Sequence, residues 1–207
     1  MDPVAGLIAD AAELGVALGA ADAARLLTLL DELASWNRRY NLTAIRDPAA
    51  MVTQHLLDSL AVSPDLAGAR VADVGTGAGF PGLPLAVANP GREFTLIDAT
   101  AKKIRFVSHA AQLLKLTNVR PLQARVESLK PALPFDTVVA RAFAPLPRLL
   151  AQVAGLCGAQ SRVLAMKGKR PDAELAALPP HWRVVGSREL RIPHLEAARC
   201  VIVLAPD

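Results

Sequence analysis

The sequence predicts an α/β fold in which helices cover a mostly parallel β-sheet, preceded by a helical N-terminal extension. Three observations support this prediction. Apolar side chains recur at helical spacing over the first sixty-odd residues, short β-rich segments alternate with helical segments from about residue 70, and a glycine-rich turn follows the first of these strands. Alternating strands and helices imply right-handed crossovers and a parallel sheet. We predict a helical cap over residues 1–65, packed on a core over residues 66–207.

Two helices are expected in the cap. Leucine and aromatic residues recur at helical spacing from Leu26 to Tyr40, which is typical of an amphipathic helix. Asp47 followed by Pro48 is typical of an N-cap and first helical position. This second helix should continue through Leu56 and end before Pro64, because a residue that precedes proline disfavours the helical conformation.

The core is expected to alternate strands with helices. The strands are predicted at 71–74, 93–98, 135–140, 162–166, 182–185 and 200–204, and the helices at 104–114 and 146–156. Residues 119–126 form a weaker candidate strand, because Pro121 cannot donate to a central ladder. Only a short connection joins the last two strands, so they should pair antiparallel and close one edge of the sheet.

Composition excludes several classes of protein. Of 207 residues, 52% are hydrophobic and 20% charged, which is typical of a folded chain with a core. No segment resembles a membrane span or a signal peptide, so we expect a cytoplasmic protein without membrane contact. Cys157 and Cys200 lie far apart and suggest neither a disulfide nor a metal site. The net charge of +4, with more arginine than lysine, favours nucleic acid as a partner.

The most informative motif is the glycine-rich turn after the strand at 71–74, which reads Asp73-Val74-Gly75-Thr76-Gly77-Ala78-Gly79-Phe80-Pro81-Gly82. Glycines at this position let the backbone turn sharply and approach a ligand. Asp98 ends the next strand, where a carboxylate can hold a ribose diol. The Gly-x-Gly-x-Gly spacing is one residue tighter than the dinucleotide fingerprint. The combination resembles the cofactor motif of S-adenosylmethionine methyltransferases, with a nicotinamide dehydrogenase or a glycine turn without a ligand as alternatives.

The absence of certain motifs narrows the choice of methyl acceptor. The strand end Val139-Ala140-Arg141-Ala142-Phe143 lacks the Asn/Asp-Pro-Pro-aromatic string that exocyclic amine methyltransferases share. Neither cysteine is well placed as the nucleophile that carbon-5 pyrimidine enzymes need. An acceptor that is already nucleophilic remains, and guanine N7 is one, because it has a free lone pair and needs alignment rather than a base. Arg141, at a strand tip, is suited to hold guanine O6 or a flanking phosphate, although a surface or ion-paired arginine is the alternative.

Several segments resemble, in their order, those of the GidB (RsmG) family of bacterial small-subunit ribosomal RNA guanine-N7 methyltransferases. They are Asn41-Leu42-Thr43-Ala44-Ile45, His55-Leu56-Leu57-Asp58-Ser59-Leu60, the glycine turn, Arg141-Ala142-Phe143-Ala144 and Lys167-Gly168. The likeness extends from about Leu26 to Val203. It implies a class I S-adenosylmethionine methyltransferase (Rossmann-like) core with an N-terminal helical extension, which methylates one guanine of 16S rRNA beside the decoding centre. It further implies S-adenosylhomocysteine as product, naked 16S rRNA or the 30S subunit as partner, no DNA partner, and a monomer.

The resemblance also implies site residues. The cofactor-binding set is Asp73, Gly75, Thr76, Gly77, Gly79, Phe80, Asp98, Val126, Glu127 and Arg141. The catalytic set is Arg141, Asn41 and His55, and the substrate or RNA set is Asn41, His55, Arg125, Lys167 and Arg199. Besides Arg141, Asn41 and His55 have structural alternatives, since Asn41 is also suited to end a helix and His55 to pack in the core.

Four functional hypotheses follow. The first is the rRNA guanine-N7 methyltransferase, and the second is a methyltransferase acting on a small molecule or a protein, which would share the cofactor site but not the Arg-rich mouth. The third is a non-catalytic RNA-binding module, against which the intact glycines, Asp98 and Arg141 argue. The fourth is a nicotinamide dehydrogenase, which the tighter glycine spacing disfavours.

Overall fold

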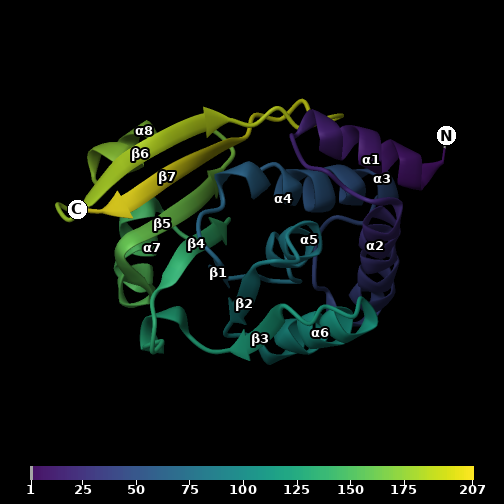
Figure 1. Ribbon diagram of the computed structural model, residues 1–207, viewed down its shortest axis with the longest axis horizontal. Helices are drawn as coiled ribbons and strands as arrows, with labels where there is room; N and C mark the ends of the chain where they lie inside the picture. Colours follow the sequence, from purple (N-terminus) through teal and green to yellow (C-terminus); the bar gives the residue numbers. More distant parts are fainter. Residues whose placement is uncertain (1) are drawn as a thin grey trace.

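A computed structural model of the chain describes residues 2–207 and contains a seven-stranded sheet with the strand order β3-β2-β1-β4-β5-β7-β6 (Figure 1). The strands are β1 (Arg70–Val74), β2 (Glu93–Asp98), β3 (Val119–Gln123), β4 (Phe135–Arg141), β5 (Cys157–Lys167), β6 (Trp182–Glu189) and β7 (Cys200–Pro206). The first five pair in parallel, and β7 pairs antiparallel with both β5 and β6. The predicted antiparallel edge is therefore confirmed, and within it β7 lies between its hairpin partner and the parallel strands.

Helices cover both faces of this sheet. They are α1 (Pro3–Glu13), α2 (Ala20–Tyr40), α3 (Pro48–Met51), α4 (Asp58–Leu60), α5 (Gly82–Ala88), α6 (Ala101–Leu113), α7 (Leu146–Val153) and α8 (Asp172–Ala176). Single turns of 3-10 helix occur at η2 (Ser63–Asp65), η3 (Val126–Ser128) and η4 (Ala154–Leu156). Figure 1 shows α7 on one side of the sheet and α2, α5 and α6 on the other.

The two faces follow from the alternation of side chains along each strand. On β4, Val139 belongs to the apolar cluster beneath α2, α5 and α6, whereas Val138 and Ala140 belong to the cluster beneath α7. All three are almost fully buried. Strands buried on both faces read as continuous apolar runs, which is typical of a parallel sheet between two helical layers.

The N-terminal helices pack on the sheet domain. Leucines of α1 and α2 share one apolar cluster with Leu83 of α5 and Phe106 of α6. Arg25 of α2 donates from Nε to Leu114 O at 3.0 Å, and Lys102 donates from Nζ to Tyr40 O at 2.9 Å. The division of the chain at residue 65 remains a prediction. No helix within residues 2–207 is both long and apolar enough to cross a membrane.

The helix predicted from Asp47 onward is interrupted. Asp47 caps α3 by accepting from Ala50 N at 2.8 Å, as expected. The next segment, η1 (Val52–Leu57), is a π-helix, and α4 follows it directly. Apolar periodicity does not distinguish a π turn from an α turn over so few residues, so this feature appears only in the structure.

The carboxyl ends of the parallel strands meet along one edge of the sheet. In the observed register Val74 pairs with Ile97 on one side and with Ala140 on the other, and Arg141 pairs with Met166. The strand order reverses between β1 and β4, since the chain moves outward from β1 to β3 and then returns to β4. Ligands of open α/β sheets bind in the crevice at such a reversal.

Candidate functional site

The glycine turn lies at this reversal and joins β1 to α5. Gly75, Gly77 and Gly79 all have positive φ angles, of 69°, 61° and 89°, a region that side chains with a Cβ rarely occupy. A Cβ on Gly75 would lie 2.3 Å from Phe143 Cδ2, whereas one on Gly77 would meet nothing closer than Gly75 O at 3.9 Å. The turn is therefore closed at Gly75 and open to a ligand at Gly77.

Asp73 lies beneath the turn and holds it in shape. Its Oδ2 accepts from Thr76 Oγ1 at 2.6 Å and from Gly82 N at 2.8 Å. The residue is 1% exposed. Burial raises the pKa of Asp73 to about 6, although these two hydrogen bonds act in the opposite direction. Asp73 and Thr76 therefore stabilise the turn from behind.

Asp98 borders a cavity of about 350 Å³, which the glycine turn lines at Gly75. Its Oδ2 accepts from Gly77 N at 3.1 Å, its Oδ1 accepts from Thr100 N at 2.8 Å, and Lys103 Nζ lies 3.4 Å from Oδ2. The same cavity is lined by Gly75, Arg125, Val126, Glu127, Ala142 and Phe143, among others. A carboxylate, a glycine turn and an apolar wall thus face one space.

A second cavity, of about 390 Å³, lies beside the first and shares Ala142 with it. The chain turns sharply there, since Ala142 has a φ of 50°. The described residues that line the second cavity include three cations, one carboxylate and one histidine: Arg141, Lys167, Arg199, Asp58 and His55. Its charge is therefore suited to an electron-rich or anionic ligand.

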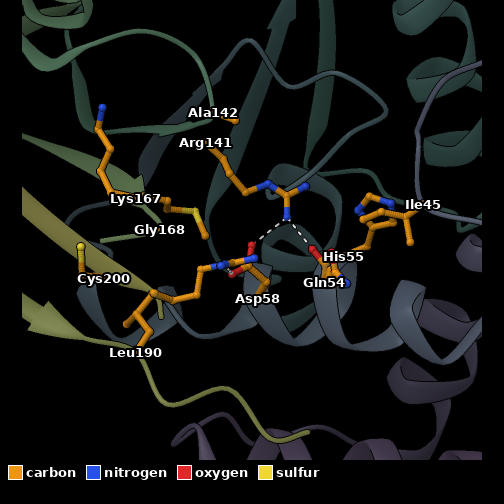
Figure 2. A pocket seen from close by; sticks show the side chains of 12 residues that line it. Ile45, Gln54, His55, Asp58, Arg141, Ala142, Lys167, Gly168, Leu190 and Cys200 are labelled. Carbon is orange, nitrogen blue, oxygen red and sulfur yellow. Dashed lines mark hydrogen bonds and ion pairs between the residues drawn. The ribbon is translucent and has the colours of Figure 1, made fainter. Parts of the chain in front are cut away.

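Asp58 joins two of these cations. Its Oδ2 accepts from Arg141 Nη1 at 2.9 Å and its Oδ1 accepts from Arg199 Nε at 3.1 Å. Arg141 Nη1 also donates to Gln54 O at 2.8 Å, and Figure 2 shows the guanidinium between Asp58 and Gln54. The side chain of Asp58 is 4% exposed. Lys167 is held separately, by Glu174 Oε2 at 2.8 Å and Ala144 O at 3.1 Å.

His55 is a buried, uncharged wall of this cavity. Its ring stacks on Phe80 with centroids 4.6 Å apart, and its Nε2 lies 3.0 Å from Thr43 Oγ1. Its Nδ1 is buried and has no hydrogen-bond partner among residues 2–207. Burial, and then the charge of Arg141, lower the pKa of His55 to about 4. At neutral pH this imidazole therefore carries no charge.

We expect the His55 ring to titrate with a pKa of about 4 in the folded protein, well below its ordinary value of 6.5. Ring carbon and proton chemical shifts followed against pH measure this, with His55→Gln used to assign the signal. Because the unfolded imidazole takes up its proton at higher pH, His55 lowers the free energy of unfolding as pH falls from about 6.5 to about 4. The raised pKa of Asp73 acts in the opposite direction over part of this range, so the site-specific shift is the measurement to use. A midpoint near 6.5 would contradict the burial argument.

The structure places some of the predicted site residues along these two cavities, whereas five members of the cofactor set line neither of them: Asp73, Thr76, Gly77, Gly79 and Phe80. Asp98, Val126 and Glu127 line the first, together with Arg125, which the family resemblance grouped with the RNA contacts. His55, Arg141, Lys167 and Arg199 line the second. Whether each residue binds cofactor, base or RNA remains a prediction.

Asn41 lies apart from both sets of lining residues. It is the C-cap of α2, exposed and left-handed with a φ of 47°, and its N–H donates to Asn37 O. This geometry matches the helix-ending alternative. Buried Asn37 organises the following turn, since its Oδ1 accepts from Leu42 N and Thr43 N at 2.6 and 2.9 Å.

Sequence reasoning missed Asp58, Gln54 and Phe143 as members of the site. Asp58 is part of the quoted segment His55-Leu56-Leu57-Asp58-Ser59-Leu60, and an acidic residue inside an apolar helical run was the available signal. Gln54 contributes its backbone carbonyl, which no side-chain pattern can indicate.

Known proteins are similar in sequence to this chain over most of its length. A profile described as GidB, rRNA small subunit methyltransferase G, matches residues 22–203. The chain is 50% identical over 194 residues to the ribosomal RNA small subunit methyltransferase G of Methylococcus capsulatus, covering 94% of each protein. It is 46% identical over 187 residues to the protein of that name from Aeromonas salmonicida, covering 90% of each.

A solved structure supports the fold. The tRNA (uracil-54, C5)-methyltransferase of Pyrococcus abyssi, in complex with S-adenosyl-L-homocysteine, superposes with a TM-score of 0.53 at 18% identity. The match covers 71% of this chain and 37% of that one. At such an identity the likeness concerns the fold, which is the Rossmann-like fold of methyltransferases.

Proposed function

Because the chain belongs to the GidB family of rRNA small subunit methyltransferases, we propose that it transfers a methyl group from S-adenosylmethionine to N7 of one guanine in 16S rRNA. The family makes it a methyltransferase that acts on RNA of the small ribosomal subunit. The observation that carries the finer proposal is the pair of cavities that meet at Ala142. One is bordered by the glycine turn and Asp98, and the other by arginines.

The first cavity fits the cofactor. Its lining combines the Asp98 carboxylate, which can accept from the two ribose hydroxyls, with the backbone of the glycine turn at Gly75. Val126 is apolar and buried and can pack against an adenine ring, with Glu127 beside it. When bound, S-adenosylmethionine would supply the methyl group. The lone pair of guanine N7 would form the new N–C bond, and the electron pair of the broken S–C bond would remain on sulfur, which leaves S-adenosylhomocysteine.

The second cavity fits a guanine. Arg141 and Arg199 retain N–H donors beyond those that bind Asp58, and such donors can hold the O6 acceptor of guanine. His55, neutral and stacked on Phe80, offers a flat apolar wall for the base. N7 bears no proton, so the residues need only to orient the base and exclude water, and no general base is required.

The decisive experiment supplies labelled S-adenosylmethionine, the purified protein and 30S subunits from cells that lack this activity. The RNA is digested and its nucleosides are separated by mass spectrometry. We expect one labelled 7-methylguanosine per 16S molecule, and comparison with naked 16S rRNA identifies which form is the substrate. No label in RNA, with cofactor binding intact, would favour a small-molecule or protein acceptor instead.

A basic groove extends the second cavity and is suited to the RNA backbone. It has a volume of about 590 Å³ and shares Leu190, Arg199 and Cys200 with that cavity. Lys169, in the connection after β5, and Arg191, in the connection between β6 and β7, both line this groove. Both are exposed and form no salt bridge within residues 2–207. We propose that phosphates next to the target guanosine lie here, where such contacts position the strand without reading its sequence.

Removing these charges should weaken RNA binding and its salt dependence together. The slope of log affinity against log salt is negative, and for Lys169→Ala and Arg191→Ala we expect its magnitude to fall by roughly 0.7 for each phosphate that the variant no longer neutralises. Affinity for S-adenosylhomocysteine should not change. Arg120→Ala is the control, because Arg120 is exposed on β3 at the opposite edge of the sheet. If the salt dependence of RNA binding is unchanged in both groove variants, the RNA backbone does not lie in this groove.

A further inference from the structure

The π turn at η1 changes which groups its backbone offers to the second cavity. In an α-helix the Asp58 N–H would donate to the carbonyl four residues earlier, which belongs to Gln54. Here it donates to Thr53 O, five residues earlier. Gln54 O accepts instead from Arg141 Nη1 at 2.8 Å. The extra residue in the turn thus makes a backbone acceptor available to the arginine, and π turns inside α-helices occur frequently at functional sites.

Asp58 begins the α-helical turn that follows, and its carboxylate accepts hydrogen bonds from arginines at the ends of two strands. One oxygen binds Arg141, the last residue of β4, and the other binds Arg199, the residue before β7. The carboxylate is nearly inaccessible to water, whereas the two arginine side chains are 20% and 25% exposed. Asp58 therefore holds both guanidiniums in the lining of the second cavity, where part of each arginine side chain remains exposed.

The donors that remain are defined by these hydrogen bonds. An arginine has five N–H donors. Arg141 uses Nη1 for Gln54 O and Asp58, and Arg199 uses Nε for Asp58 and Nη1 for Ala198 O. Each arginine keeps its other donors in one orientation, because a planar guanidinium held at two points cannot rotate without breaking a bond. Without the carboxylate, both long side chains would regain rotamer freedom and repel each other.

We propose that Asp58, presented by the π turn, is a positioning residue for methyl transfer that holds Arg141 and Arg199 in the orientation in which they bind the acceptor base. This inference rests on the proposed function and concerns the same site. Asp58 does not touch the reacting atoms and acts through the two arginines. Misplacing an orienting group by about 1 Å can cost on the order of 100-fold in rate, so its removal should affect turnover more than cofactor binding.

The first test is Asp58→Asn, which keeps the shape and removes the charge. We expect kcat for methylation of the RNA substrate to fall by about 10- to 100-fold, with the Kd for S-adenosylhomocysteine within about twofold of the wild type. Asp65→Asn is the matched control. Asp65 also binds an arginine, Arg188, at 2.5 Å, but neither residue lines the second cavity. Wild-type kcat in Asp58→Asn would overturn the proposal.

A double-mutant cycle separates positioning from a general effect on the fold. If Asp58 acts through Arg199, the double variant Asp58→Asn/Arg199→Ala should lose about as much kcat as the worse single variant. Losses that multiply would contradict the proposal. Should Asp58→Asn not fold, Asp58→Glu retains the charge but moves the carboxylate by one methylene. It should bind S-adenosylhomocysteine and still lose turnover, whereas full turnover would overturn the proposal.

The activity of the wild type in the same assay distinguishes failure of the proposed function from failure of the role proposed for Asp58. If the wild type does not methylate small-subunit RNA, the proposed function fails. If it does and the cycle shows independent effects, only the positioning role of Asp58 fails.

Discussion

Replacing Arg141 by alanine is expected to reduce kcat for RNA methylation by about 10²- to 10³-fold while the chain still folds and binds S-adenosylhomocysteine. Removing one preorganised donor from an active site typically costs this much. Arg141 lies at the junction of the two cavities, next to Ala142, and its guanidinium carbon is 5.9 Å from the centre of the Phe80 ring. Arg141→Lys should lose nearly as much, because an ammonium cannot bind Gln54 O, Asp58 and a base edge in one plane. Turnover by purified protein on small-subunit RNA is the measurement.

Arg188→Ala is a closely matched control for this variant. Arg188 Nη2 donates to a backbone carbonyl, Ala61 O at 2.9 Å, and to a carboxylate, Asp65 Oδ2 at 2.5 Å. Arg141 makes the same two kinds of hydrogen bond through Nη1. A loss of kcat confined to Arg141→Ala therefore reflects its place in the site. Unchanged turnover in Arg141→Ala would remove this residue from the catalytic set.

The second large effect is expected at Asp98. Asp98→Ala should weaken binding of S-adenosylmethionine and S-adenosylhomocysteine by roughly 10- to 100-fold, since a hydrogen bond to a charged group is worth about 1.5–3 kcal/mol. Calorimetric titration measures this directly, and RNA affinity in the absence of cofactor should change little. Asp98→Asn separates two causes, because it keeps one oxygen acceptor for Gly77 N or Thr100 N while removing the charge.

Glu93→Ala is the control for Asp98, because Glu93 is exposed and begins the strand that Asp98 ends. A cofactor affinity that is unaltered in both Asp98 variants would mean that the ribose is held by other residues. A thermal shift with S-adenosylhomocysteine and none with NAD would further separate this site from that of a nicotinamide dehydrogenase.

The position of the glycine turn and of Asp98 beside it was largely predictable from local sequence. A strand, a glycine turn, a helix and an acidic strand end follow one another within about thirty residues. Asp73, Gly75 and Asp98 therefore required only the parallel order of β1 and β2 to come together. The roles of the side chains required the structure. Asp73 binds Thr76 and Gly82 beneath the turn, whereas Asp98 borders the cavity.

For the second cavity, the sequence indicated candidate residues but not their arrangement. Arg141, Arg199 and His55 were singled out, yet nothing in their local sequence indicates a shared carboxylate. Asp58 is 83 residues from Arg141 and 141 residues from Arg199. The π turn that presents it differs from an α-helix in backbone hydrogen bonding, as in the bond from Asp58 N to Thr53 O, which a pattern of apolar residues cannot encode separately from an α-helix.

Local sequence was sufficient to predict the fold class, the antiparallel edge and the place of the glycine turn, because side-chain periodicity and glycine conformational freedom act over a few neighbouring residues. The folded chain was needed to show that Asp58 binds both arginines, that His55 is buried and uncharged, and that Arg125 faces the first cavity. These properties depend on burial and on contacts between distant segments. They arise once the order of β4, β5 and β7 brings the ends of those strands against the helix that follows α3.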